Sequence, residues 1–427
     1  MSVDLSPLEE IERLVQRRAR DLDADTDGDP GVMRALVAEA IAAWEVDHKR
    51  GVRPFPLPEP ERLAERALRN LTGYGPLTAL LADDDVWEIM VNAPSEIFVK
   101  RHRGRSGYHD EVFHDDDHVA RTITKVLEDS SSAHRKLDPS AGLQDAQLDD
   151  GSRLHIVHGD IGRGGHLIVN IRRFSGVAFT DLDQLVGADM LDRHAAALLT
   201  TCVRAGSTIV FAGAPGSGKT TLLSCCCARL DPTLRVVIAE EVFEADVPAP
   251  NLASLQTRPA RADRPEIDLR RLVSGFLRMA PDIAIVGEVR DREALPLLLT
   301  LSSGVKGFTT IHAGSARQAL TRLRFVAQLA DHALPLSALN TLVAEAVDVV
   351  VHCARTPRGP RVTEIIAVED LAGGPDAAQF TTTPLYERAA PDQPLRWSGQ
   401  RPVRLDQHVR RAGLDLLDAL DPGGERR

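Results

Sequence analysis

A glycine-rich octapeptide in the middle of the chain constrains the fold more than any other feature. Residues 213–220 read Gly-Ala-Pro-Gly-Ser-Gly-Lys-Thr, a complete G-x-x-x-x-G-K-[ST] match. A strand pattern at 208–211 precedes this loop, and a helix pattern follows from Lys219. In that context the glycines let backbone N–H groups turn toward phosphates at a helix N-terminus. The nucleotide-binding residues that we expect are Gly213, Ala214, Pro215, Gly216, Ser217, Gly218, Lys219, Thr220 and Thr221.

Acidic residues close two of the apolar strand patterns that follow the loop. Residues 235–239 run into Glu240 and Glu241, and residues 283–287 run into Glu288. The alternation of short strands and helices predicts a parallel, doubly wound sheet, whose strand ends open on the edge where the loop lies. We therefore expect these carboxylates to converge on the γ-phosphate, with Thr220 and Glu288 near a Mg²⁺ ion.

A histidine follows a third strand pattern in the same series. Residues 307–311 precede His312, and two threonines come just before it. A histidine beside a core is often structural, but this one follows a strand in the same alternating pattern. We therefore expect His312 to sense or position the γ-phosphate.

Composition bounds the class of protein. The chain has 427 residues and a net charge of −11, which argues against a dedicated nucleic-acid-binding surface. The first 20 residues lack the apolar stretch of a signal peptide, and no apolar run approaches the roughly 18 residues of a membrane span. The five cysteines form no C-x-x-C pair, so we expect buried thiols in a reducing compartment. These features predict a cytosolic protein whose membrane contacts go through partners.

The pattern along the chain predicts four segments. They are a helical extension with a proline-rich linker (1–60), a small α/β domain (61–180), a P-loop domain (181–353) and a strand/helix segment with a disordered tail (354–427). In the extension, Ser6 and Glu9 form a capping-box pattern at the start of a helix that runs to about residue 20. A second helix is expected at about 32–46. We expect both helices to dock on the chain itself, with a partner surface as the alternative.

Two clusters imitate metal sites. Residues 23–28 copy the opening of an EF-hand loop, but Arg34 occupies the position of the bidentate carboxylate, which favours an acidic linker. His109, His114 and His118 lie near residues 115–117, which are all aspartate. Those aspartates also suit the first turn of a helix, and we prefer that interpretation to a metal site.

The motif series resembles a known family. Residues 213–220, 240–244, 287–290 and 310–313 resemble the Walker A, Asp box, Walker B and His box of the type II/IV secretion ATPase superfamily. Upstream, segments at 73–77, 88–92, 150–154 and 171–174 look like the N-terminal domain of the CpaF/TadA branch, which drives assembly of Tad (Flp-type) pili. The resemblance covers roughly residues 71 to 368.

The resemblance implies a RecA-like P-loop motor that hydrolyses ATP with Mg²⁺ as a hexameric ring. Lys219 and Thr220 would hold the phosphates and Mg²⁺, Glu288 would assist Mg²⁺ or water, and Glu241 or Glu240 would activate water. Relatives complete the site with arginines from the smaller domain or a neighbouring subunit. Arg172, Arg173, Arg258 and Arg278 are the candidates here. The implied partners are inner-membrane platform proteins of a pilus or secretion machine, at the cytoplasmic face of the membrane.

The chain departs from the family pattern at several positions. Glu241 stands where the family usually has aspartate, Ala214 and Pro215 replace small or hydroxyl residues, and Gly314 replaces a common asparagine. The cysteine-rich zinc module of type II secretion ATPases is absent from the sequence, which favours the CpaF-like branch.

Two alternatives remain open. One is a DNA-transfer ATPase of conjugation, which the acidic net charge and the upstream motifs disfavour. The other is a nucleotide-gated scaffold without hydrolysis, for which the substitution at Glu241 is the only support.

Overall fold

The computed structural model describes most of the chain as two compact units, residues 1–175 and 176–427. The described residues are 6–22, 30–101, 104–130, 136–173, 179–258, 260, 264–330, 334–374, 379–390 and 393–420. The EF-hand-like segment 23–28, Phe174 and the tail 421–427 lie outside them. The division of the chain into four segments stays a prediction.

The first unit begins with three helices, α1 (Pro7–Asp21), α2 (Pro30–Lys49) and α3 (Pro60–Thr72). The expected capping box is present, because Ser6 Oγ accepts from the backbone of Glu9 and the Glu9 carboxylate accepts from the backbone of Ser6. Apolar residues of the three helices form a common core, which includes Ile11, Trp44 and Ala67. The first two helices therefore dock on the chain itself, as the sequence predicted.

The proline-rich segment 53–60 lies inside this unit and is held against α2. Trp44 Nε1 donates to the carbonyl of Phe55 over 3.3 Å, and the backbone N–H of Leu57 donates to Glu45 over 3.1 Å. Leu57 is buried in the helical core. A buried side chain and two hydrogen bonds hold this segment in place. In a free linker, the same side chain and backbone groups would be exposed to solvent.

A six-stranded antiparallel sheet with the order β3-β2-β1-β6-β5-β4 completes the first unit. Its strands are β1 (Val86–Ala93), β2 (Glu96–Arg101), β3 (Gly107–Tyr108), β4 (Leu143–Gln147), β5 (Arg153–Val157) and β6 (Ile168–Arg172). Helices α4 (Leu77–Ala82) and α5 (Asp116–Asp129) share its core, and the 3₁₀ turns Pro139–Ala141 and Arg163–Gly165 lie before β4 and between β5 and β6. Asp115 caps α5 by accepting from the backbone of His118, so the aspartates occupy the first helical turn as expected.

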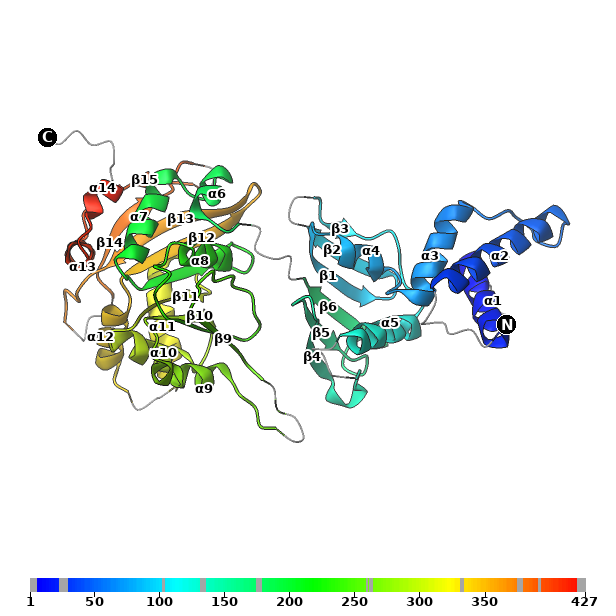
Figure 1. Cartoon of the computed structure of the whole chain (residues 1–427), viewed down its shortest axis with the longest axis horizontal. Helices are drawn as coiled ribbons and strands as arrows, with labels where there is room; N and C mark the ends of the chain where they lie inside the picture. Colours follow the sequence, from blue (N-terminus) through cyan, green and yellow to red (C-terminus); the bar gives the residue numbers. More distant parts are fainter. Residues whose placement is uncertain are drawn as a thin grey trace. The chain divides into compact units, whose positions relative to one another are not determined.

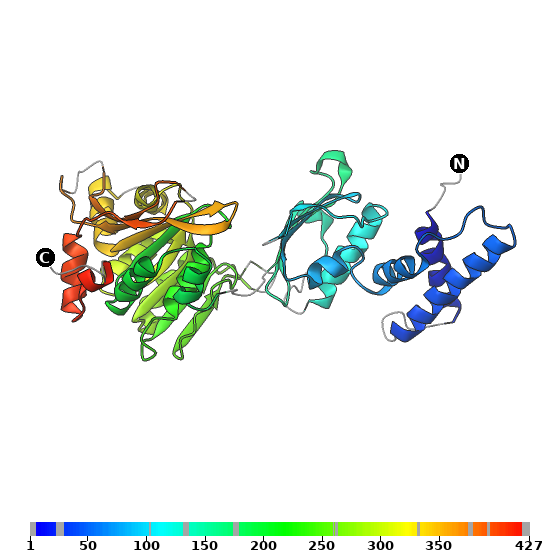
Figure 2. The ribbon, with the colours of Figure 1, turned by 90° about the horizontal axis from the view of Figure 1, so that it is seen from above.

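The second unit contains a nine-stranded sheet with the order β15-β14-β13-β12-β7-β11-β10-β8-β9 (Figures 1 and 2). The strands from β12 to β9 in that order are mutually parallel, and β13, β14 and β15 are antiparallel additions. The bounds are β7 (Ile209–Gly213), β8 (Val236–Glu240), β9 (Leu252–Gln256), β10 (Ile283–Val289), β11 (Lys306–Ile311), β12 (Val349–Thr356), β13 (Gly359–Val368), β14 (Thr382–Glu387) and β15 (Arg396–Trp397).

Helices cover both faces of this sheet. Along β7, Ile209 and Phe211 enter one hydrophobic core and Val210 and Ala212 enter another, as alternation along a strand requires. The first core is shared with α6 (Leu182–Gly187), α7 (Arg193–Arg204), α8 (Lys219–Cys227), α13 (Val403–Arg411) and α14 (Leu416–Leu420). The second is shared with α9 (Leu269–Ser274), the 3₁₀ turn Phe276–Met279, α10 (Ala294–Ser302), α11 (Ala316–Ala330) and α12 (Leu336–Ala346). This is the expected α/β architecture.

The chain beyond residue 354 belongs to the same sheet. The expected segment boundary falls within β12, and β13 pairs with β12 along its length. The sequence predicted a strand/helix segment here, and the structure shows the strands β14 and β15 and the helices α13 and α14 after β13. Within the described part of the chain, no helix combines the length and apolar character needed to cross a membrane.

Candidate nucleotide-binding site

The P-loop turns tightly between β7 and α8. A Cβ at Gly213 would lie 2.2 Å from the carbonyl oxygen of Cys353 and 2.5 Å from Ser217 Oγ, so only glycine fits there. Gly218 caps α8 with a φ of +86°, in the left-handed region that glycine adopts without strain. The loop therefore has the tight backbone geometry that a phosphate cradle requires.

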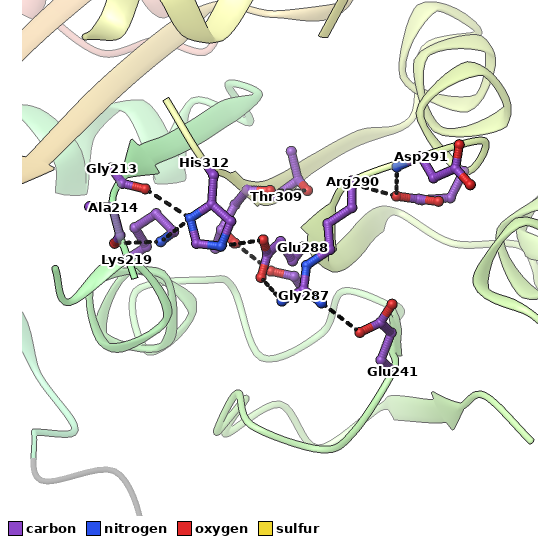
Figure 3. A network of polar contacts seen from close by, with 12 residues as sticks. Gly213, Ala214, Lys219, Glu241, Gly287, Glu288, Arg290, Asp291, Thr309 and His312 are labelled. Atoms are coloured by element: carbon purple, nitrogen blue, oxygen red, sulfur yellow. Dashed lines mark hydrogen bonds and ion pairs between the residues drawn. The ribbon is translucent and has the colours of Figure 1, made fainter. Parts of the chain in front are cut away.

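Lys219 is the first residue of α8, and its buried side chain turns back over the loop. Its Nζ donates to the carbonyl of Ala214 over 3.0 Å and lies 3.3 Å from Nδ1 of His312. That same Nδ1 is 3.1 Å from the carbonyl oxygen of Gly213. His312 follows β11, so the lysine and the histidine meet beside the P-loop residues Gly213 and Ala214 (Figure 3).

Glu288 lies within β10, next to β11, and its two oxygens face different partners. Oε1 is 2.7 Å from Nε2 of His312, and Oε2 accepts from Nη2 of Arg290 over 2.8 Å. Burial alone raises the pKa of Glu288. The hydrogen bond from Arg290 and the positive charges around the carboxylate outweigh that effect, and the net result is a pKa below its usual range. Glu288 is therefore held as a carboxylate.

Arg290 continues these contacts to the end of a second strand. Its Nη1 donates to Oε2 of Glu241 over 3.0 Å, and Glu241 directly follows β8. The result is a polar chain of five side chains, Lys219, His312, Glu288, Arg290 and Glu241 (Figure 3). The sequence analysis included Arg290 only as the last residue of the Walker B match, 287–290, and gave it no role.

Glu240 and Glu241 face different surroundings. Glu240 is buried, and its Oε1 accepts from the backbone N–H groups of Glu244 and Ala245 over 3.0 and 2.9 Å. A Cβ at Gly287 would lie 2.8 Å from Cγ of Glu240, so the two strand ends are in close contact. Glu240 therefore orders the loop after β8, whereas the half-exposed Glu241 meets Arg290. The sequence left the division of roles between these residues open.

Two threonines of β11 fix His312 relative to Glu288. Thr309 Oγ1 donates to the carbonyl of Val286, and Thr310 Oγ1 donates to the carbonyl of Gly287, each over 2.8 Å. The Thr-Thr pair before the histidine was visible in the sequence, but its bonds across the strands were not foreseen. These bonds set the register on which the contact between His312 and Glu288 depends.

The loop residues fit a phosphate group and Mg²⁺. Ser217 Oγ is buried without a hydrogen-bond partner among the described residues, beside the space that a Cβ at Gly213 would fill. Thr220 and Thr221 are half-buried in the first turn of α8, next to Lys219. A cation, hydroxyl groups and a carboxylate are the donor set that such a ligand needs.

The four arginine candidates each have surroundings of their own in the structure. Arg172 lies on β6, opposite Glu88 and Arg153. Arg173 Nη1 donates to the carbonyls of Leu80 and Asp83 in the first unit. In the second unit, Arg258 donates to the carbonyl of Pro265, and Arg278 is exposed in the 3₁₀ turn before β10. Their catalytic roles stay predictions.

Comparison with known proteins places this site in a family. The family "Type II/IV secretion system protein" matches residues 70–362, which include the whole polar chain. The protein belongs to the type II/IV secretion system family. The match also includes all six strands of the sheet of the first unit, as the resemblance implied.

Individual relatives of this type II/IV secretion system protein come from several bacteria. A putative conjugal transfer protein of Mycobacterium tuberculosis is 33% identical over 71% of this chain and 86% of that protein. The conjugal transfer protein TrbB of Rhizobium radiobacter is 31% identical over 69% of this chain and 87% of its own length. The crystal structure of the VirB11 ATPase from the Brucella suis type IV secretion system aligns at 25% identity over 68% of this chain and 94% of that chain, with a TM-score of 0.35.

Proposed function

We propose that this chain is a Mg²⁺-dependent ATPase that works as a hexameric motor for a pilus or secretion machine. The observation that carries the proposal is the polar chain, in which a P-loop lysine, a strand-end histidine and a strand-end carboxylate meet within 2.7 to 3.3 Å. Phosphoryl transfer needs mainly positioning and charge stabilisation, and this set of groups provides both.

The residues divide the work as follows. Lys219 leaves the carbonyl of Ala214 to bind phosphate oxygens, and Thr220 and Glu288 hold Mg²⁺ at the start of α8 and the end of β10. Mg²⁺, when bound, offsets the charge that develops on the phosphates. His312 positions the γ-phosphate and Glu288 relative to each other. Glu241 orients the attacking water, because Glu240 is already occupied by the backbone of its own loop.

The finer assignment is to the CpaF/TadA branch and to assembly of a Tad (Flp-type) pilus. It rests on the upstream motifs, such as residues 73–77, 88–92 and 150–154. On this proposal six copies form a ring, with Arg172, Arg173 or Arg258 supplied across subunits. The ring lies in the cytoplasm against inner-membrane platform proteins, with no specific nucleic acid among its partners.

A conjugative DNA-transfer ATPase is the second candidate. Relatives in Mycobacterium tuberculosis and Rhizobium radiobacter carry names of conjugal transfer proteins, which favours it, whereas the net charge of −11 does not. Turnover measured with and without single- and double-stranded DNA separates the two. A several-fold stimulation by DNA would favour the conjugative candidate over the pilus motor.

The test of the ATPase proposal is steady-state ATP hydrolysis with Mg²⁺ over a wide range of protein concentration. We expect activity that rises steeply with concentration and is lost in Lys219→Ala and Glu288→Gln. ATP binding without turnover, even in the assembled ring, would refute the motor proposal and favour the nucleotide-gated scaffold.

A further inference from the structure

Arg290 lies between carboxylates that belong to two different strands. Its Nη2 donates to Glu288 within β10, and its Nη1 donates to Glu241 just after β8. The two strands are parallel neighbours, paired from Ile283 with Val236 to Val286 with Ala239. One guanidinium group therefore ties together the ends of two adjacent strands (Figure 3).

The main chain at this position is fixed by a buried acid. Glu293, which is 5% exposed, accepts from the backbone N–H of Arg290 over 2.5 Å and from that of Asp291 over 2.8 Å. These bonds fix the turn that joins β10 to α10. The main chain at Arg290 is therefore held in place independently of the ion pairs of its side chain.

The geometry of this pair of contacts suits arginine. The guanidinium fork presents N–H groups in fixed directions, so two of its nitrogens can serve two separate acceptors. A lysine carries the same charge on one nitrogen atom. Without a cation between them, the carboxylates of Glu241 and Glu288 would repel each other. Glu241 is half-exposed and would then turn into solvent, while Glu288 would keep its contact with His312.

We propose that Arg290 is a positioning residue for the ATPase site. By spanning Glu241 and Glu288, it fixes the acidic loop after β8 relative to β10 and so places Glu241 to orient the attacking water. The expected effect on ATP turnover rests on the proposed ATPase function. The expected effect on the stability of the nucleotide-free protein does not.

The kinetic test compares Arg290→Gln and Arg290→Lys with Arg292→Gln, which alters an exposed arginine two positions further along. We expect Arg290→Gln to lower kcat by roughly 10- to 100-fold with little change in the KM for ATP, because misplaced catalytic groups slow the reaction more than they weaken binding. Arg290→Lys should fail to restore kcat, and Arg292→Gln should match the wild type. A lysine variant as active as the wild type would overturn the proposal, since charge alone would then suffice.

A second test needs no nucleotide. Chemical denaturation of the full chain would compare Arg290→Gln, Glu241→Gln and the double variant. Because both residues share one contact, the double variant should lose less stability than the two single effects added together. Arg292→Gln combined with Glu241→Gln should be additive. Additivity in the Arg290 cycle would overturn the proposal, even in a preparation that hydrolyses no ATP. Absence of turnover in the wild type, with a non-additive cycle, would count against the ATPase function alone.

Discussion

Nε2 of His312 lies 2.7 Å from Oε1 of Glu288, and this contact joins the ends of two adjacent parallel strands. The second oxygen of Glu288, Oε2, accepts a hydrogen bond from Arg290. The imidazole therefore faces a carboxylate that is held from the other side. The other ring nitrogen, Nδ1, lies 3.3 Å from Nζ of Lys219 and 3.1 Å from the carbonyl oxygen of Gly213. The histidine thus links the P-loop to the acid of β10.

Replacing His312 by alanine should slow ATP turnover by on the order of 100-fold, because Lys219 and Glu288 lose the group that sets their separation. Steady-state hydrolysis at saturating ATP measures the change. His194→Gln, in α7 of the same unit, is the matched control and should behave as the wild type. An unchanged kcat in His312→Ala would show that this contact is not used in the reaction.

Alanine at Glu240 and at Glu241 should have opposite signatures. Glu240→Ala removes the acceptor of two backbone N–H groups, and we expect a loss of about 1–3 kcal/mol in the free energy of unfolding. Glu241 is half-exposed, so Glu241→Ala should change stability by less than about 1 kcal/mol while it lowers turnover. Denaturant titration beside a hydrolysis assay measures both. Equal stability losses would contradict this division of roles.

A methyl group at Gly287 should disturb the acidic loop. The added Cβ of Gly287→Ala would lie 2.8 Å from Cγ and 3.1 Å from Oε1 of Glu240. We expect a loss of about 1–3 kcal/mol, because Glu240 must shift away from the backbone groups that it binds. Gly187→Ala is the control, since its Cβ would meet nothing within 4 Å. Thermal or chemical unfolding of the two variants should separate them clearly, and a neutral Gly287→Ala would mean that the loop adapts without cost.

Acid should destabilise the first unit through His118. Burial lowers the pKa of His118 to about 4 from its ordinary value of 6.5, and its Nδ1 already accepts from the backbone N–H of His114. Between those two pH values the unfolded chain binds a proton at His118 that the folded chain does not. Stability should therefore fall as the pH drops from 6.5 toward 4, by up to about 3 kcal/mol at the acid end.

The measurement is denaturation of the full chain from pH 7 to pH 4, with His118→Gln as the comparison. The glutamine amide can still accept from His114 but does not titrate, so the variant should show a shallower loss of stability in this window. Parallel curves for the two proteins would rule out His118 as the source.

The sequence alone was sufficient to predict that the P-loop and the polar residues at the strand ends lie at one edge of the sheet. The functional groups follow one another in a fixed order along the chain: the P-loop, the acids at the end of β8, Glu288 in β10 and then His312. In a parallel sheet, that order brings them to one edge. The capping box at Ser6 and Glu9 was equally readable, because both partners lie within one helical turn.

Contacts between side chains that are far apart in the sequence could not be predicted from it. Arg290 and Glu241 are 49 residues apart, and their ion pair depends on the path of the loop after β8. The packing of Leu57 against the N-terminal helices depends likewise on tertiary structure. The strand β15 has two residues, too few for a period-2 pattern to emerge.

The five cysteines offer a practical consequence. Cys202, Cys225, Cys226, Cys227 and Cys353 are all buried, and burial raises the pKa of each thiol above its ordinary value. Thiolates react with maleimide-type labels and thiols do not, so the native cysteines should label slowly while the protein is folded. A single cysteine introduced on each unit could then carry a fluorophore pair without first removing the native five. The distance between the two units could be followed through the nucleotide cycle in an otherwise unaltered protein.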